Sequence, residues 1–325
     1  MTFLASLKLT LACLLWLLLS VYLAYHFAGL SEQNDAALWL LVPPLAMLSF
    51  NLIAAIITNP SFRAQPALLL FHIALLAIAL LIGIGQLMNM KGWTEVAVGA
   101  VYDGSVNEPR AGLLHPWHIE ELRFINVGFE IDYAPGPSRR HTSNQIRWQN
   151  SEGEEQMAVI GDQVPLLLQG YRFYTSFNKG FAPKFLWRDA QGQVLNGVVH
   201  LPAWPEHEFN QSTEWTPAGS KQMLWMQLEF DDPILSEDSP SRFRLPKTYQ
   251  LVVRVDEQRV VLQPGDELQL SDGVLVFLGL TTWMGYSIFY DPTRHWLLAA
   301  CLLAVVSIAW HFWNKYANRP WLQQE

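Results

Sequence analysis

Four apolar segments constrain this chain more than any other feature of its sequence. They cover about residues 9–28, 37–58, 67–87 and 296–313, and a membrane-spanning helix needs roughly 20 predominantly apolar residues. Only 15% of the 325 residues are charged, against roughly 25% in an ordinary soluble protein. The sequence therefore predicts an integral membrane protein with three N-terminal transmembrane helices and one C-terminal helix, and it excludes a wholly cytosolic enzyme.

The first apolar segment is interpreted as a retained anchor. It exceeds the roughly 7–15 residues of a secretory signal core, and no small-x-small cleavage pattern follows it. Basic residues next to the spans predict their orientation, because cytoplasmic flanks are enriched in Lys and Arg. The basic residues on the expected cytoplasmic side are Lys8, Arg63, Lys315 and Arg319, whereas the loop between the first two spans carries only the acidic Glu32 and Asp35. Lys91 and Arg294 lie on the other side, each at a membrane end where its side chain can snorkel, and slightly weaken this asymmetry. We therefore expect both termini in the cytoplasm of a bacterium and residues 92–290 in the periplasm or on the outer face.

The long segment between the third and fourth spans has the pattern of a β domain. Short stretches with apolar residues at every second position alternate with turn residues, which favours antiparallel strands. The clearest stretches are 129–133, 145–148, 157–160, 171–174, 249–255, 274–277 and 286–290. A short helix is expected at 116–124, and 202–220 and 231–247 are expected to be long surface connections. The predicted organisation is thus 1–91 for three transmembrane helices, 92–290 for a β-rich domain, and 291–325 for the fourth helix and a short tail.

Charge and motifs narrow the function of this domain. Residues 92–290 contain 15 Lys and Arg but 25 Asp and Glu, and the whole chain carries a net charge of −8. Binding of nucleic acid is therefore excluded, since phosphate recognition needs clustered basic residues. The domain has no glycine-rich phosphate loop and no hydrolase signature. We interpret it as a docking or shaping domain.

Two cysteines, Cys13 and Cys301, are the only ones in the chain, and both lie in apolar spans. This pattern offers neither a disulfide framework nor a CxxC redox pair nor a thiolate metal site. We expect both to be small packed residues of membrane helices. Any thiol chemistry must then belong to a partner.

His72, in the third span, is the polar residue that most needs an explanation. An imidazole in lipid is costly and usually faces a partner, a cavity or a cofactor. It could form an interhelical hydrogen bond, or it could be an axial haem ligand. His311, near the cytoplasmic end of the fourth span, is predicted at a similar depth and could face His72, although its place beside Trp310 and Trp313 is also typical of an interface residue.

The other seven histidines give weaker signals. His26 and His295 fall at the ends of spans, where polar residues are ordinary. His115 and His118 have the spacing of metal ligands, but no carboxylate or cysteine is placed to complete a site. His141, His200 and His207 are expected to be ordinary surface residues.

Several blocks of this sequence, in this order, resemble the ResB (also CcsB) family of cytochrome c biogenesis proteins. The resemblance spans nearly the whole chain, and the three-plus-one arrangement of spans fits it. It rests on Ala5-Ser-Leu-Lys-Leu9, the intramembrane His72, Phe129-Glu-Ile-Asp-Tyr133 followed by Gly136-Pro137, the block 164–176, and Met284-Gly-Tyr-Ser-Ile-Phe-Tyr-Asp-Pro292.

This resemblance implies a role in the system II route of cytochrome c maturation. ResB-like proteins pair with a ResC/CcsA-like membrane protein to carry haem outward and attach it to the CxxCH motifs of apocytochrome c. The family's intramembrane haem ligand corresponds to His72, so the implied cofactor is a transient haem b. The tryptophan-rich haem-presenting motif of the pathway belongs to the partner. The implied role is that of an accessory subunit of a haem lyase, working beside a thiol-reducing partner.

Two other classes of function stay open at this stage. A membrane b-type cytochrome would need paired histidines on neighbouring spans, and His72 with His311 would allow one haem at most. A purely structural anchor or assembly factor would use His72 only to hold helices together.

Overall fold

A computed structural model of the chain describes residues 3–27, 35–206 and 210–317. The chain divides into two compact units. The helical unit comprises residues 1–91, 109–117 and 289–325, and the β unit comprises residues 92–108 and 118–288. Segment 109–117 thus belongs with the helices although it lies inside the expected 92–290 domain. Glu32, His207 and Arg319 lie outside the described residues.

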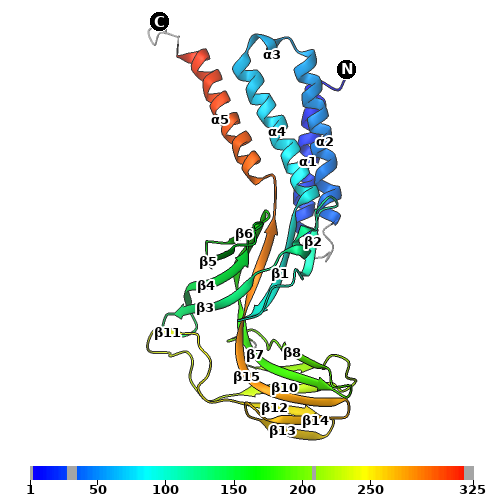
Figure 1. Cartoon of the computed structure of the whole chain (residues 1–325). Coiled ribbons are helices and arrows are strands. Elements are labelled where there is room, and N and C mark those ends of the chain that lie inside the picture. Colours follow the sequence, from blue (N-terminus) through cyan, green and yellow to red (C-terminus); the bar gives the residue numbers. More distant parts are fainter. Residues whose placement is uncertain (1–2, 28–34, 207–209, 318–325) are drawn as a thin grey trace. The chain divides into compact units, whose positions relative to one another are not determined.

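The helical unit contains the four expected long helices (Figure 1). They are α1 (Leu7–Phe27), α2 (Asp35–Thr58), α4 (Pro66–Met88) and α5 (Arg294–Tyr316), and a single turn, α3 (Ser61–Ala64), precedes α4. Each long helix is long and apolar enough to cross a membrane, and α4 is the most apolar, with a mean hydropathy of 2.8. The prediction of three N-terminal helices and one C-terminal transmembrane helix is confirmed.

Small residues let α4 and α5 approach each other closely. The buried residues of α4 are Ala67, Ala74 and Gly85, and those of α5 are Ala300, Ala304 and Ser307. A Cβ on Gly85 would lie 2.9 Å from the hydroxyl of Thr293, at the base of α5. Such surfaces are typical of membrane helices, which associate through close packing because lipid offers no hydrophobic driving force between helices.

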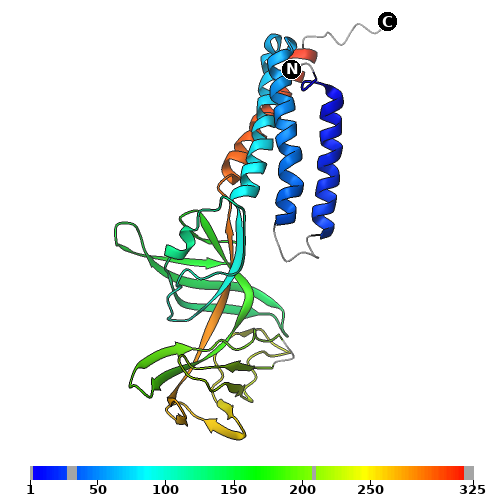
Figure 2. The same cartoon turned by 90° about the vertical axis from the view of Figure 1, so that its right-hand side faces the viewer.

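Helix α1 is joined to α2 by a polar contact. The Oδ1 atom of Asn51 accepts a hydrogen bond of 2.7 Å from Thr10, and its amide donates to the backbone oxygen atoms of Leu4 and Ser6. Asn51 is buried. Figures 1 and 2 show that α1 begins and α5 ends at the same end of the helical unit, where α3 also lies.

The β unit consists of antiparallel sheets that do not close into a barrel within the described residues. Its largest sheet has the order β2-β1-β15-β7-β6, with β14 added to β15 and β8 to β7. Two four-stranded sheets have the orders β13-β12-β10-β9 and β11-β3-β4-β5. The strands are β1 (Met90–Ala97), β2 (Asn107–Ala111), β3 (Ile125–Tyr133), β4 (Arg139–Gln149), β5 (Glu155–Gly161), β6 (Leu166–Leu168), β7 (Tyr171–Asp189), β8 (Val194–Val198), β9 (Ser212–Trp215), β10 (Leu224–Glu229), β11 (Ser241–Arg242), β12 (Gln250–Val255), β13 (Gln258–Leu262), β14 (Glu267–Leu270) and β15 (Gly273–Tyr290).

Most strand predictions are confirmed, with three corrections. The stretches 274–277 and 286–290 are the two ends of one 18-residue strand, β15. The expected helix at 116–124 is reduced to a 3₁₀ turn over His118–Glu121. The segments 202–220 and 231–247 are not wholly surface connections, because they contain β9 and β11. The pairing of β11 with β3, which lies far away in the sequence, is a contact that a local pattern does not contain.

The core of the β unit combines aromatic packing with a buried polar group. Tyr102 stacks on Phe124 with ring centroids 4.9 Å apart, and Tyr286 meets Phe124 edge to face. The hydroxyl of Tyr286 donates a hydrogen bond of 2.7 Å to Asn144, whose amide donates to Asn126 and to the backbone of β3. All of these side chains are buried. The hydrogen bonds among Tyr286, Asn144 and Asn126 therefore satisfy polar groups that would be costly to bury alone.

Candidate functional site

His72 lies on α4, in the second turn from the end that adjoins α3. Its imidazole meets Phe62 of α3 edge to face, with ring centroids 4.5 Å apart, and meets its neighbour Phe71 in the same way at 5.4 Å. Phe62 is itself buried. The short turn α3 thus folds an aromatic ring back onto His72 and limits the positions that the imidazole can take.

The hydrogen bond of His72 fixes which ring nitrogen carries the proton. Nδ1 lies 2.7 Å from the backbone oxygen of Leu68, one turn earlier in the same helix. A carbonyl oxygen can only accept, so Nδ1 donates its proton, and in the neutral imidazole Nε2 then keeps its lone pair. A histidine that binds a metal typically donates its other N–H to a backbone carbonyl or carboxylate, which orients the ring and raises its basicity. His72 is therefore prepared to act as a ligand through Nε2.

The same geometry argues against a purely structural role. Among the described residues, the one hydrogen bond of His72 stays within its own helix, and none joins it to α1, α2 or α5. The expected structural alternative was an interhelical hydrogen bond, and the described residues provide none. Each span has at most 28% of its apolar window buried within the chain, so a large lateral surface is left for lipid or for a partner helix.

His311 is placed on a different side of α4 from His72. On α5 it continues the line of Ala300, Ala304 and Ser307, at spacings of four and three residues, that packs toward α4. On α4, the matching line runs through Ala67, Ala74 and Gly85. At about 100° per residue, His72 lies about 140° around the helix from that line. The described residues show no hydrogen bond or ring contact between His72 and His311, whose ring contact is with Phe312.

The two histidines also differ in depth. Gly85 of α4 and Thr293 at the base of α5 meet, which provides a common origin. At 1.5 Å per residue, His72 lies about 20 Å along α4 from that point and His311 about 27 Å along α5. The structure therefore does not bring the two predicted haem ligands together.

The motif His115-Pro-Trp-His118 does not form a metal site in the described part of the chain. His115 is buried in the helical unit, and its Nδ1 donates a hydrogen bond of 3.0 Å to the backbone oxygen of Met88, at the end of α4. His118 is exposed, in the 3₁₀ turn of the β unit. No group of three or more His, Cys, Asp or Glu side chains that could hold a metal ion occurs among the described residues. A haem iron needs only one or two protein ligands, so this finding leaves a role for a single histidine.

The two cysteines have different environments. Cys13 is buried in α1, as expected, whereas Cys301 is exposed on α5, so the prediction that both are packed is wrong for Cys301. Its α5 position lies away from the line of small residues that packs on α4. His26 and His295 are exposed at the ends of α1 and α5, as expected for interface residues.

His200 is not an ordinary surface residue. Its Nδ1 lies 2.9 Å from a carboxylate oxygen of Glu95 on β1, and its ring stacks on buried Trp283 with centroids 5.4 Å apart. The pair borders a hollow of about 330 Å³ that Glu206 and Asn178 also line. The sequence analysis missed this contact because the two partners are separated by 105 positions. His141, by contrast, is exposed, 3.5 Å from Asp162.

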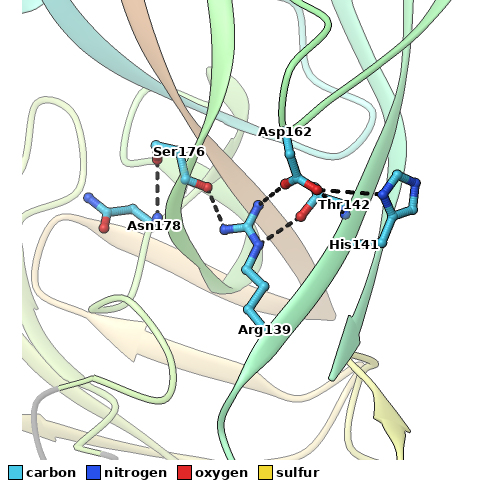
Figure 3. A network of polar contacts seen from close by, with 6 residues as sticks. All are labelled: Arg139, His141, Thr142, Asp162, Ser176 and Asn178. Carbon is cyan, nitrogen blue, oxygen red and sulfur yellow. Dashed lines mark hydrogen bonds and ion pairs between the residues drawn. The ribbon is translucent and has the colours of Figure 1, made fainter. Parts of the chain in front are cut away.

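A network around Arg139 connects β4 to β7 (Figure 3). The guanidinium donates hydrogen bonds of 2.7 Å to the hydroxyl of Thr142 and to the backbone oxygen of Ser176, and it forms an ion pair with Asp162 at 3.7 Å. Burial lowers the pKa of Arg139, while the carboxylate of Asp162 opposes this shift. The polar contacts of the Arg139 guanidinium thus all join parts of the β unit to one another, which is typical of a side chain with a structural role.

Lys179 lies near this network and is 4% exposed. Its ammonium group lies 5.5 Å from the ring centroid of Tyr133. Burial lowers the pKa of Lys179 to about 8, and repulsion from Arg139 adds to the effect. Burial also raises the pKa of Tyr133, to about 12. Burial of the charged Lys179 therefore lowers the stability of the β unit.

Comparison with known proteins locates the chain among protein families. Residues 65–325, which include α4, the β unit and α5, match the ResB-like family. No curated protein matches the chain. A solved structure titled "Cytochrome c Heme Lyase CcmF" is similar at 12% identity and a TM-score of 0.27, over 92% of this chain. The match covers 34% of that chain, so this protein spans about a third of its length. A TM-score of this size does not establish a common fold.

Proposed function

This chain belongs to the ResB-like family of cytochrome c biogenesis proteins, and we propose that it is the subunit of a system II haem-attachment complex that helps carry haem across the membrane. In this proposal a ResC/CcsA-like membrane protein is its partner and apocytochrome c is the acceptor. The observation that supports the proposal most is the state of His72. It is the histidine in the interior of an apolar span whose Nδ1–H is held by its own helix and whose Nε2 has no hydrogen-bond partner among the described residues.

The chemistry of this histidine suits a transient haem ligand. A haem iron, when bound, would take an imidazole nitrogen of His72 as a ligand, and its protein ligands would help to set its redox potential. The bond from Nδ1–H to the carbonyl of Leu68 holds the imidazole in one tautomer. Contact with Phe62 limits its rotation. Because His311 lies on another side of α4 and at another depth, we assign the second axial ligand to the partner.

The proposed orientation follows from charges at one end of the helical unit. The start of α1, the turn α3 and the end of α5 lie at the same end of the helical unit (Figures 1 and 2). Each carries one basic residue, and these are Lys8, Arg63 and Lys315, respectively. By the positive-inside rule this end faces the cytoplasm of a bacterial inner membrane. His72 then lies near the cytoplasmic side, where haem would enter, and the β unit lies in the periplasm or on the outer face.

The acidic β unit would hold the apocytochrome or brace the partner. It offers no thiol, since Cys13 and Cys301 both lie in the membrane helices. The reduced state of the apocytochrome thiols therefore depends on a separate thiol-reducing partner. In this proposal the chain is an accessory subunit that positions haem and acceptor.

The test compares two matched variants of the complex with the ResC/CcsA-like partner. His72→Ala and His311→Ala each remove one imidazole from a membrane helix. We expect His72→Ala to lower both the haem content, measured as the pyridine haemochrome, and the yield of holocytochrome c by about tenfold or more. His311→Ala should leave both close to those of the unaltered complex. Equal haem content and equal cytochrome yield in His72→Ala would refute the proposal and favour a structural anchor.

A further inference from the structure

The segment Pro109–Trp117 folds back onto the end of α4. The backbone N–H of Leu114 donates a hydrogen bond of 2.8 Å to the oxygen of Leu87, and that of Gly112 donates one of 2.9 Å to the oxygen of Asn89. His115 adds its Nδ1–H to the oxygen of Met88, at 3.0 Å. Three consecutive carbonyl groups at the end of a membrane helix are thus bound by one segment.

These bonds give partners to carbonyl groups that would otherwise be unpaired at the end of the membrane helix. The last four carbonyl groups of a helix lack partners within it, and an unsatisfied carbonyl is costly where water is scarce. The segment approaches so closely that a Cβ on Gly112 would collide with the backbone of Leu87. Segment Pro109–Trp117 is therefore fixed at the depth at which α4 ends.

Within this segment His115 is buried, whereas the exposed side chains are Pro109, Arg110, Leu113, Leu114 and Trp117. His115 is 6% exposed and packs edge to face against Trp117 and Tyr290. Leu113 is 65% exposed, Leu114 63% and Trp117 47%. The base of α5 lies at the same level, because Thr293 meets Gly85. It carries a further exposed tryptophan, Trp296.

We propose that Pro109–Trp117 is a membrane anchor in which Leu113 and Leu114 insert among the lipid acyl chains at the end of α4. Leaving two leucines in water forgoes the free energy that apolar side chains gain when they leave water. Lipid is the occupant because the segment continues the surface of α4, a helix apolar enough to cross a membrane whose apolar window is only 11% buried within the described chain. Tryptophan at the interfacial level and apolar side chains below it are the arrangement that membrane boundaries favour. The buried His115 cap holds the anchor to the helix.

The anchor can be tested with nitroxide labels on the full chain in lipid nanodiscs. In a Cys13→Ser, Cys301→Ser background, single cysteines replace Leu113, Leu298 on α5 and Met157 on β5. The last two are exposed controls for lipid and for water, respectively. Collision rates with oxygen, which partitions into lipid, and with a nickel chelate, which stays in water, are measured for each label. We expect an oxygen-to-nickel ratio at Leu113→Cys several-fold above that of Met157→Cys and close to that of Leu298→Cys.

Two results would overturn the anchor. A ratio at position 113 equal to that of Met157→Cys would place the segment in water. Low collision rates with both reagents would show that protein covers it instead, whether a partner or a second copy of the chain. A label at Leu114→Cys repeats the measurement, so that a single unfavourable substitution does not decide the outcome.

Discussion

The helical unit and the β unit use buried asparagines in the same way but in different solvents. In the helical unit, Asn51 joins the start of α1 to α2. In the β unit, Asn144 joins Tyr286 to Asn126 in the centre of the core. Lipid surrounds most of the first unit, whereas water competes for the polar groups of the second when it unfolds. A polar side chain in a span therefore stands out in the sequence, while one in the β unit is hidden among ordinary surface residues.

This comparison explains why His72 and His200 were interpreted so differently. An imidazole inside a run of leucines needs a reason, and in the described part of the chain His72 has an Nδ1–H bound to its own helix and no hydrogen bond at Nε2. An imidazole in an extended, polar stretch needs none, and its ion pair with Glu95 became visible only in the fold. A candidate functional residue in the helical unit can thus be recognised from the sequence, whereas one in the β unit is recognised only from its contacts in the fold.

Removal of Asn144 should have the largest effect on stability. In Asn144→Ala the Tyr286 hydroxyl and the Asn126 carbonyl oxygen lose their partners inside a core without access to water. We expect the β unit to lose about 3 kcal/mol, since each unsatisfied buried group costs about 1–3 kcal/mol. Denaturant unfolding followed by tryptophan fluorescence measures this loss. A change below about 1 kcal/mol would show that the core rearranges to satisfy these groups.

Replacement of Lys179 should stabilise the β unit, whereas replacement of Asn144 should destabilise it. Its pKa falls from 10.5 to about 8 in the folded protein, so folding is penalised at every pH below 8, and the penalty fades as the pH rises toward 10.5. Lys179→Met should therefore raise the free energy of unfolding at pH 7 by at most about 3 kcal/mol, since each pKa unit corresponds to about 1.4 kcal/mol. The gain should shrink steadily between pH 8 and pH 10.5. A gain that does not depend on pH would mean that packing, and not charge, is its cause.

Substitution of Asn51 tests whether hydrogen bonds in the helical unit contribute less to stability than those in the β unit. Hydrogen bonds between membrane helices contribute about 0.6 kcal/mol on average, because the unfolded chain in lipid also finds partners. We expect a coupling energy of about 1 kcal/mol or less between Asn51→Ala and Thr10→Val in a double-mutant cycle, measured by detergent-induced unfolding. A coupling as large as the cost of Asn144→Ala would contradict the contrast drawn between the two units.

The smallest effect is expected at the surface of the β unit. Arg242 on β11 lies 3.0 Å from Asp132 and 3.1 Å from Glu130 on β3, and all three side chains are exposed. Exposed ion pairs are screened by water and contribute little. Arg242→Gln should leave the unfolding midpoint of the β unit unchanged within error at physiological salt. A clear loss would show that β11 depends on this ion pair for its place beside β3.

The sequence predicted the helices more fully than the sheets. Runs of about 20 apolar residues have few alternatives to a membrane helix, and all four spans were found within a few residues of their ends. Strand β15 was divided in two because the stretch around Gly279 breaks the apolar alternation. Gly279 has φ of +118°, a local distortion that the strand absorbs because its neighbours on both sides hold it in register.

The candidate site was predictable only in part. The type of residue and its surroundings singled out His72, but the bond to Leu68 and the contact with Phe62 depend on how α3 turns back onto α4. The suggestion that His311 could face His72 rested on depth alone. His311 lies in line with the small residues of α5 that pack on α4, whereas His72 lies on another side of α4. The return of segment 109–117 to α4 has no local signal, because it depends on carbonyl groups some 25 residues earlier.

The measurement that tests the account most directly is the haem spectrum of the complex with and without the His72 imidazole. The complex with the ResC/CcsA-like partner is purified in its unaltered form and as His72→Ala, and the variant is then supplied with imidazole. We predict a haem absorption spectrum in the unaltered complex that is lost or shifted in His72→Ala and returns when imidazole replaces the missing ligand. Identical spectra before imidazole is added would contradict the account, because the haem would then be held without His72.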